Sequence, residues 1–248
     1  MNPVKKQEEY FGTETNKIRF LSNLIEFFGN KDIQVISASG DADYLIVSTA
    51  LEIAASTLEP VILVGNDTDL QCMLVERCNY NNLYVQLDTG NPAKIFKVQD
   101  AQANVTENQR SVLNVVHCLS GCDTSSTVFG KQKGSTWNVL KEMKSNEIEK
   151  LKVFCNDSAS HTQIKSAGEL FLLLWYGCPA TSTVDKQRYL MYNKRISKMK
   201  LTSTFKLETL PPTLDADAQH SFRAYHTVQQ CLWMSENLNE MWSHVSDM

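Results

Sequence analysis

The sequence predicts an α/β fold in which short apolar strands alternate with helices. Two runs of residues lead to this prediction. IQVIS (33–37) and VILVG (61–65) are short and rich in β-branched residues. Each is followed by a polar turn and then by a stretch that is compatible with a helix. This alternation is typical of parallel β-α units, so we expect a mostly parallel sheet.

The other elements before residue 122 follow from the same patterns. Apolar residues at helical spacing predict an amphipathic helix over 18–28, and they are Ile18, Leu21, Leu24, Ile25 and Phe28. The turn residues of DTGNP separate two further strands and indicate a hairpin. Thr106 and Gly121 are the start and stop signals of another helix. In chain order we expect helices over 42–56 and 68–77, strands over 83–87 and 94–98, and a helix over 106–121.

A polar stretch at 145–165 is interpreted as a linker or loop. It separates a core at 1–144 from a helical C-terminal extension at 166–248. In the extension we expect a buried helix over 168–177, a basic helix over 183–200, and a third helix after Pro211 and Pro212.

Composition restricts the class of protein and its setting. The chain has 248 residues, of which 42% are hydrophobic and 21% charged, and its formal net charge is -4. These values are ordinary for a globular protein. No apolar run is long enough for a membrane span, and no signal-peptide core is present. The seven cysteines contain no C-x-x-C pair, which favours reduced thiols and an intracellular protein of the nucleus or cytoplasm.

Acidic residues follow the predicted strands in three clusters, SGDADYLIV, VILVGNDTDLQCML and HCLSGCDTSSTVFGKQKG. In sheets of parallel β-α units, the turns after the strands meet at one edge and form ligand sites. Several carboxylates in one place repel each other unless a cation is bound. Oxygen ligands suit Mg²⁺ or Mn²⁺. The predicted metal ligands are Asp41, Asp43, Asp67, Asp69 and Asp123.

Structural explanations exist for the same residues. Aspartate is common at helix N-caps and in first helical turns, so either acidic pair can be explained without a metal. His117, Cys118 and Cys122 are close enough in sequence to suggest a zinc site. No second ligand pair with zinc-like spacing follows them, and buried thiols explain Cys118 equally well.

The acidic segments resemble those of a nuclease family. GDADYLIVSTAL, GNDTDLQCML and SGCDTSSTVFGKQKGS are similar to the acidic turns of the flap endonuclease and XPG-like nucleases of the PIN-like superfamily. More narrowly, the chain resembles uncharacterised asteroid-like animal proteins. The resemblance implies a PIN-like, Rossmann-like three-layer domain. It also implies a structure-specific nuclease that cleaves DNA or RNA phosphodiesters with two metal ions, in which the five aspartates are catalytic.

The chain departs from this family at its start. Members carry a further aspartate on the first strand, whereas residues 1–32 have the pattern of an amphipathic helix. We therefore expect a fragment, a truncated gene model or a degenerate copy that lacks the N-terminal first strand. The alternative function is a catalytically dead nucleic-acid-binding or protein-interaction module of the same fold. A third hypothesis, an aspartyl-phosphate intermediate at Asp67 or Asp69, fits less well because Gly65 and Asn66 separate them from the strand.

Two basic segments are candidate contacts for a nucleic-acid backbone. Glycines and lysines before a helix can hold a phosphate, and in the resembling nucleases the corresponding region grips DNA. The basic helix over 183–200 can also neutralise phosphates, although a solvated helix face is an equal alternative. The expected partner is branched or single-stranded DNA, or RNA. The predicted contacts are Gly130, Lys131, Lys133, Gly134, Lys194, Arg195 and Lys198.

Overall fold

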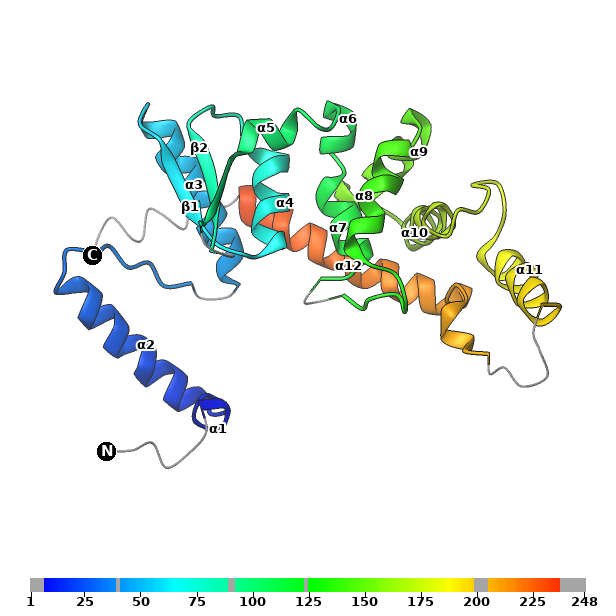
Figure 1. Ribbon diagram of the computed structural model, residues 1–248, viewed down its shortest axis with the longest axis horizontal. Helices are drawn as coiled ribbons and strands as arrows, with labels where there is room; N and C mark the ends of the chain where they lie inside the picture. The colour runs from blue at the N-terminus through cyan, green and yellow to red at the C-terminus, as the bar shows by residue number, and fades with distance from the viewer. Residues whose placement is uncertain (1–6, 39–40, 89–91, 123–124, 199–204, 237–248) are drawn as a thin grey trace. The chain divides into compact units, whose positions relative to one another are not determined.

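The fold is taken from a computed structural model, which describes residues 7–38, 41–88, 92–122, 125–198 and 205–236 (Figure 1). Contacts divide the chain into two compact units, Met1–Ala42 and Asp43–Met248.

The first unit contains two helices, α1 (Gln7–Phe11) and α2 (Glu14–Gly29). The amphipathic helix expected over 18–28 is confirmed by α2. Its apolar side chains are not buried, and Ile18 is 58% exposed. The strand expected over 33–37 is wrong, because these residues have no regular secondary structure. A strand needs a hydrogen-bonded neighbour, and the described part of this unit contains none.

The second unit contains a three-stranded sheet in the order β1-β2-β3. Strand β1 (Val61–Val64) pairs in parallel with β2 (Leu83–Leu87), and β2 pairs antiparallel with β3 (Lys94–Lys97). The α/β class and the hairpin are therefore confirmed. The expected mostly parallel sheet is wrong for the described residues, because one of the two strand pairs is antiparallel.

One face of this sheet packs into the core. Leu63, Leu83 and Val85 are buried, whereas Ile62 and Val64 on the other face of β1 are exposed. This alternation follows from the two-residue period of a strand. The carboxyl end of β1 leads through Gly65 and Asn66 into the next helix, which carries the acidic residues of interest.

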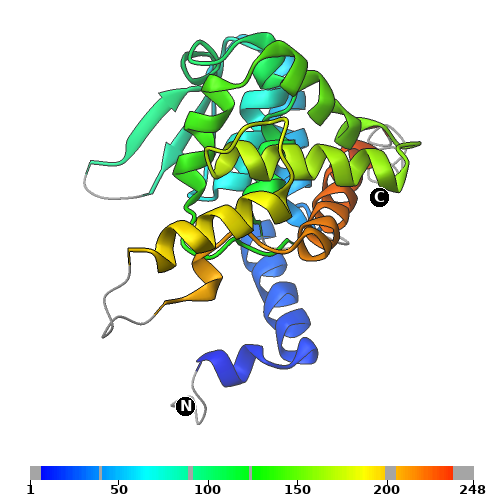
Figure 2. The same ribbon diagram turned by 90° about the vertical axis from the view of Figure 1, so that its right-hand side faces the viewer.

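Helices make up most of the second unit (Figures 1 and 2). The helices expected over 42–56 and 68–77 are confirmed with the same bounds. The helices, with two short 3-10 turns, are α3 (Ala42–Ser56), α4 (Thr68–Arg77), α5 (Val98–Gln102), α6 (Glu107–Arg110), α7 (Leu113–Ser120), α8 (Lys133–Glu142), α9 (Ser145–Leu151), η1 (Lys152–Cys155), α10 (His161–Trp175), α11 (Val184–Ile196), η2 (Leu207–Thr209) and α12 (Leu214–Glu236).

The helix expected over 106–121 is divided into α6 and α7. Its predicted start is confirmed, because Thr106 and Gln109 form a reciprocal capping box. The chain leaves the helical path at Val112, which is fully buried. Its predicted end is also confirmed, since Gly121 closes α7 with a φ of 103°. Every residue of α7 is buried, so this helix lies in the core.

Residues 145–165 are not the expected loop. They include α9, η1 and the start of α10, and Ile148, Leu151 and Phe154 are buried. The polar residues between these three side chains occupy the exposed side, which explains why the segment reads as polar.

Helices α10 and α12 pack against each other (Figure 2). Their close approach depends on Gly168, because a Cβ atom there would lie 1.8 Å from the Ser221 hydroxyl oxygen. None of the described helices is both long enough and apolar enough to cross a membrane.

Candidate functional site

The acidic turn after β1 forms the start of α4. Asp67 is the N-cap residue of this helix, and its carboxylate accepts a hydrogen bond of 2.9 Å from the Asp69 backbone N–H. Asn66 accepts a bond from the Asp88 backbone N–H at 2.8 Å, which ties the turn to the end of β2. The helix-cap explanation is therefore correct for Asp67.

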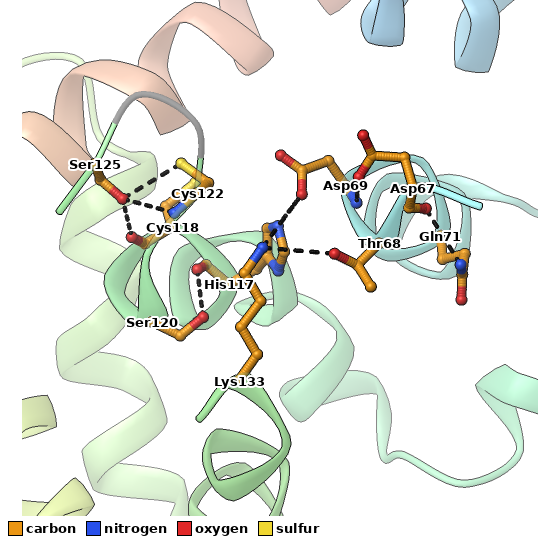
Figure 3. A network of polar contacts seen from close by, with 10 residues as sticks. All are labelled: Asp67, Thr68, Asp69, Gln71, His117, Cys118, Ser120, Cys122, Ser125 and Lys133. Carbon is orange, nitrogen blue, oxygen red and sulfur yellow. Dashed lines mark hydrogen bonds and ion pairs between the residues drawn. The ribbon is translucent and has the colours of Figure 1, made fainter. Parts of the chain in front are cut away.

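Asp69 is the centre of a charged cluster that joins three helices (Figure 3). Its Oδ1 atom lies 2.7 Å from His117 Nε2 on α7 and 3.5 Å from Lys133 Nζ on α8. Lys133 also lies 3.5 Å from the Thr68 hydroxyl. The His117 side chain is only 9% exposed and that of Asp69 is 22% exposed. We call Asp69, His117 and Lys133 the acid-base cluster.

The pKa values in this cluster favour charged partners. Burial alone would lower the pKa of His117, but hydrogen bonds to the Asp69 and Cys72 side chains outweigh it and raise the pKa to about 10. The hydrogen bond from His117 lowers the pKa of Asp69 to about 2, against the opposing effect of burial. At neutral pH the two residues therefore form an ion pair, with Lys133 as a second cation.

Among the described residues, Cys118 and its neighbours do not form a group of three possible metal ligands. Hydrogen bonding with Cys122 raises the pKa of the Cys118 thiol, and burial raises it further. The Ser125 hydroxyl donates to the Cys118 carbonyl at 2.7 Å and accepts from the Cys122 backbone N–H at 3.0 Å (Figure 3). These bonds close the turn after α7.

The five predicted metal ligands do not gather within the described residues. Asp41 belongs to the first unit, Asp43 lies in the first turn of α3, and Asp123 lies outside the described residues. In the part of the chain that the structure describes, no three histidine, cysteine, aspartate or glutamate side chains form a possible metal site. Asp67 and Asp69 are engaged by a helix end and by two cations, so this part does not fit Mg²⁺ or Mn²⁺.

The glycine-lysine segment is held by internal contacts. Lys131 Nζ donates to the Trp175 carbonyl at 2.7 Å and lies 4.2 Å from the centre of the Tyr176 ring. Burial lowers the pKa of Lys131. Gly130 forms a turn with a φ of 71°, and Gly134 lies in the first turn of α8. Because Lys133 pairs with Asp69, both lysines already have partners within the protein.

Helix α11 has a different character, because most of its side chains are exposed. Lys194, Arg195 and Lys198 are all exposed, and Arg195 also donates to the Thr209 hydroxyl. Three of the seven predicted nucleic-acid contacts thus lie on or just after an accessible helix. Sequence analysis missed the aromatic residues there: Tyr189 is 65% exposed, and Tyr192 packs edge-on against Phe205. The sequence feature that could have revealed these aromatic residues is the alternation of tyrosine with lysine and arginine.

Comparison with known proteins gives no relative, because no family model, no curated protein and no solved structure matches the chain.

Proposed function

We propose that this chain is a single-stranded nucleic-acid-binding module that has the ancestry of a PIN-like, XPG-like nuclease but performs no metal-dependent hydrolysis. The observation that carries the proposal is the exposed surface of α11, where aromatic rings lie among basic side chains. The α11 surface is defined here by Lys186, Tyr189, Tyr192, Lys194, Arg195, Lys198 and Phe205.

The aromatic rings of the α11 surface supply a stacking platform. Tyr189 is largely exposed, and the ring centres of Tyr192 and Phe205 are 5.7 Å apart. The Arg195 guanidinium lies 5.9 Å from the centre of the Phe205 ring. Bases of single strands stack on exposed aromatic rings without sequence preference, at about 1–3 kcal/mol per base. An arginine beside an aromatic ring, as Arg195 lies beside Phe205, is suited to this type of recognition.

The charges of the α11 surface are available to phosphates. Lys186, Lys194 and Lys198 are exposed. Asp185 is the only acidic residue of α11, and it accepts a hydrogen bond of 3.3 Å from the Leu214 backbone N–H. The local charge is therefore positive although the formal net charge of the chain is -4. Such a surface attracts a phosphate backbone and releases its counterions.

The acid-base cluster supports the non-catalytic half of the proposal. A metal ion bound through Asp69 Oδ1 would displace the bond of that oxygen to His117 and its contact with Lys133. Both partners are cations at neutral pH and would repel an incoming divalent ion. Two-metal hydrolysis by the five aspartates is the competing proposal, and it requires this cluster to open.

Fluorescence anisotropy with a labelled oligothymidylate tests nucleic-acid binding. We expect binding at low salt, and a fall of more than tenfold in affinity for the double variant Tyr189→Ala and Tyr192→Ala, because two bases lose their stacking partners. Tyr80→Ala is the matched control, since Tyr80 is an exposed tyrosine outside the α11 surface. Equal loss in the control, or no binding by the original chain, would contradict the proposal.

The salt dependence of the same binding tests the charges. For single strands the slope of log K against log salt falls by about 0.7 for each phosphate contact that is removed. Replacing Lys194 and Lys198 with alanine is expected to flatten the slope by about 1.4, whereas Lys150→Ala should leave it unchanged. An unchanged slope in the double variant would show that these lysines are solvated and do not contact phosphates.

A further inference from the structure

One cavity of the second unit lies between α11, α12 and the segment that follows α7. Its volume is about 500 Å³, which is within the range of ligand sites. Arg188 lines it from α11 and Arg223 from α12, and Ser126 and Phe129 line it from the segment after α7. Two basic side chains and an aromatic ring therefore surround the same space.

The cavity borders the α11 surface. Arg188, Tyr192 and Arg195 follow one another at helical spacing, so they share one face of α11. The distance from Arg188 to Arg195 along the helix axis is about 10 Å. Arg195 donates to the Thr209 hydroxyl, and the next residue, Leu210, lines the cavity. A strand bound at the α11 surface therefore lies close to the entrance of the cavity.

One wall of the cavity is built by a defined chain of hydrogen bonds. His220 Nε2 lies 2.9 Å from the Leu119 carbonyl, so this nitrogen carries the proton. His220 Nδ1 then accepts from the Ser126 hydroxyl at 3.1 Å, and Arg223 donates to the same hydroxyl oxygen at 2.9 Å. Burial lowers the pKa of His220, which keeps its ring neutral. The chain holds the exposed Arg223 guanidinium at the cavity.

The other basic group and the aromatic ring are also accessible. Arg188 donates to the Pro211 carbonyl through one nitrogen, and a guanidinium has further N–H groups for an anion. Phe129 is 51% exposed. Arginine binds phosphate groups through paired hydrogen bonds, and exposed aromatic rings stack bases. The cavity thus repeats the two kinds of side chain that form the α11 surface.

Two acidic residues line the cavity as well, and they affect its charge differently. Asp217 is only 1% exposed, and burial raises its pKa to about 7, so it is partly protonated at neutral pH. Glu208 is exposed, so its charge opposes a bound phosphate. Because two arginines face this one exposed acid, the accessible charge of the lining is positive.

We propose that the cavity continues the nucleic-acid path of the α11 surface, with Arg188 and Arg223 at phosphates further along the same single strand and Phe129 under one of its bases. This inference rests on the proposed function, because the strand is the one bound at α11. It specifies a longer strand as the ligand. Stacking and phosphate contacts do not read base edges, so the path has no sequence preference.

Fluorescence anisotropy with labelled oligothymidylates of about 4 and about 12 nucleotides tests the length of the path. We expect the longer probe to bind at least tenfold more tightly to the original chain. In Phe129→Ala this ratio should fall at least fivefold, because the longer strand loses a stacking partner. Phe27→Ala is the matched control, since Phe27 is 54% exposed and lies on α2, and it should retain the ratio.

Substitutions of charged residues test the phosphate contacts with the longer probe. Arg223→Gln is expected to flatten the slope of log K against log salt by about 0.7, the value for one phosphate contact on a single strand. Arg223→Lys should restore the slope, which loss of the Ser126 hydrogen bond alone would not explain. Glu208→Gln should strengthen binding, because it removes the exposed negative charge. Arg110→Gln is the control, since Arg110 does not line the cavity.

The results separate this inference from the proposed function. Binding that depends on Tyr189 and Tyr192, but not on Phe129 or Arg223, would overturn the path and leave the α11 surface as the whole site. Absence of binding to both probes would overturn both proposals. Equal affinity of the original chain for the two probes would also contradict the longer path, without any variant.

Discussion

Asp69 and His117 are 48 residues apart in sequence, yet their side chains meet at 2.7 Å. The contact connects the start of α4 to the buried helix α7. It therefore stabilises the arrangement of two helices that pack against each other.

The ion pair should contribute to stability over a limited pH range. The pKa of Asp69 is lowered to about 2, so its contribution is present above pH 4 and is lost as pH falls toward 2. The pKa of His117 is raised to about 10, so its contribution is complete below pH 6.5 and is lost as pH rises toward 10. We expect the free-energy cost of Asp69→Asn, measured by urea unfolding, to be greatest between pH 4 and 6.5.

The expected loss of unfolding free energy can be given a size for the other residue of the pair, His117. We expect His117→Gln to lower the free energy of unfolding by about 3 kcal/mol at pH 6, as for other broken buried ion pairs. Asp100→Asn is the control, because Asp100 is exposed. Equal stability of His117→Gln and the original chain would show that the pair is energetically neutral.

A substitution at Glu76 should change the free energy of unfolding in the opposite direction, because its buried charge is unfavourable. It accepts a hydrogen bond from Asn114, but burial is the larger effect and raises the pKa of Glu76 to about 7. Because the folded state holds this proton more tightly than the unfolded state, stability decreases as pH rises from about 4.5 to 7. Glu76→Gln keeps the acceptor without the charge, so we expect it to raise the unfolding free energy by about 1–3 kcal/mol at pH 8. The variant should have little effect at pH 4.

The matched control for Glu76 is Glu107→Gln. The Glu107 side chain is 91% exposed and should show no such pH dependence. A variant of Glu76 that is destabilised at pH 8 would contradict the assignment of a buried, unfavourable charge.

Alanine substitutions at two glycines distinguish the effect of packing on stability from the effect of helix propensity. Gly168→Ala should destabilise the protein by about 1–3 kcal/mol, since a Cβ atom there collides with Ser221 on α12. Gly134→Ala should instead be neutral or stabilise by up to about 1 kcal/mol, because no atom lies within 4 Å of its Cβ position. Thermal unfolding measures both. A stabilised Gly168→Ala variant would show that α10 and α12 can separate without cost.

Metal addition tests the competing nuclease proposal. With the acid-base cluster closed, we expect Mn²⁺ to leave the melting temperature unchanged, and to give the same calorimetric heats for Asp69→Asn as for the original chain. Saturable binding that is lost in Asp69→Asn would favour the metal-dependent enzyme instead.

Local patterns predicted the individual elements well, but they did not predict partners that are distant in sequence. The bounds of α3, α4 and β2 follow from apolar spacing and helix caps, and the Thr106 capping box follows from two residues three positions apart. Residues 33–37 have the composition of a strand, but a strand also depends on a neighbour that composition does not specify. The segment at 145–165 is the opposite case. Its composition is polar, but three apolar residues on one side are enough to bury that side in the core.

The candidate site illustrates the same limit. The sequence singled out Asp69, His117 and Lys133, but in three different hypotheses: a magnesium site, a zinc site and a phosphate cradle. Only the packing of α4, α7 and α8 brings them together and makes each the partner of another. Asp217 carried no signal at all, because its burial depends on contacts that form between helices.

Trp175 occupies a position that gives the protein an internal optical reporter. Its indole N–H donates to the Ser135 hydroxyl at 2.7 Å, and its backbone carbonyl accepts from Lys131. The side chain is buried, so its emission belongs at short wavelengths. Any event that separates the start of α8 from the end of α10 breaks both bonds and admits water to the ring. In a variant whose three other tryptophans are replaced by phenylalanine, a shift of this emission to longer wavelengths would therefore report the opening of that junction.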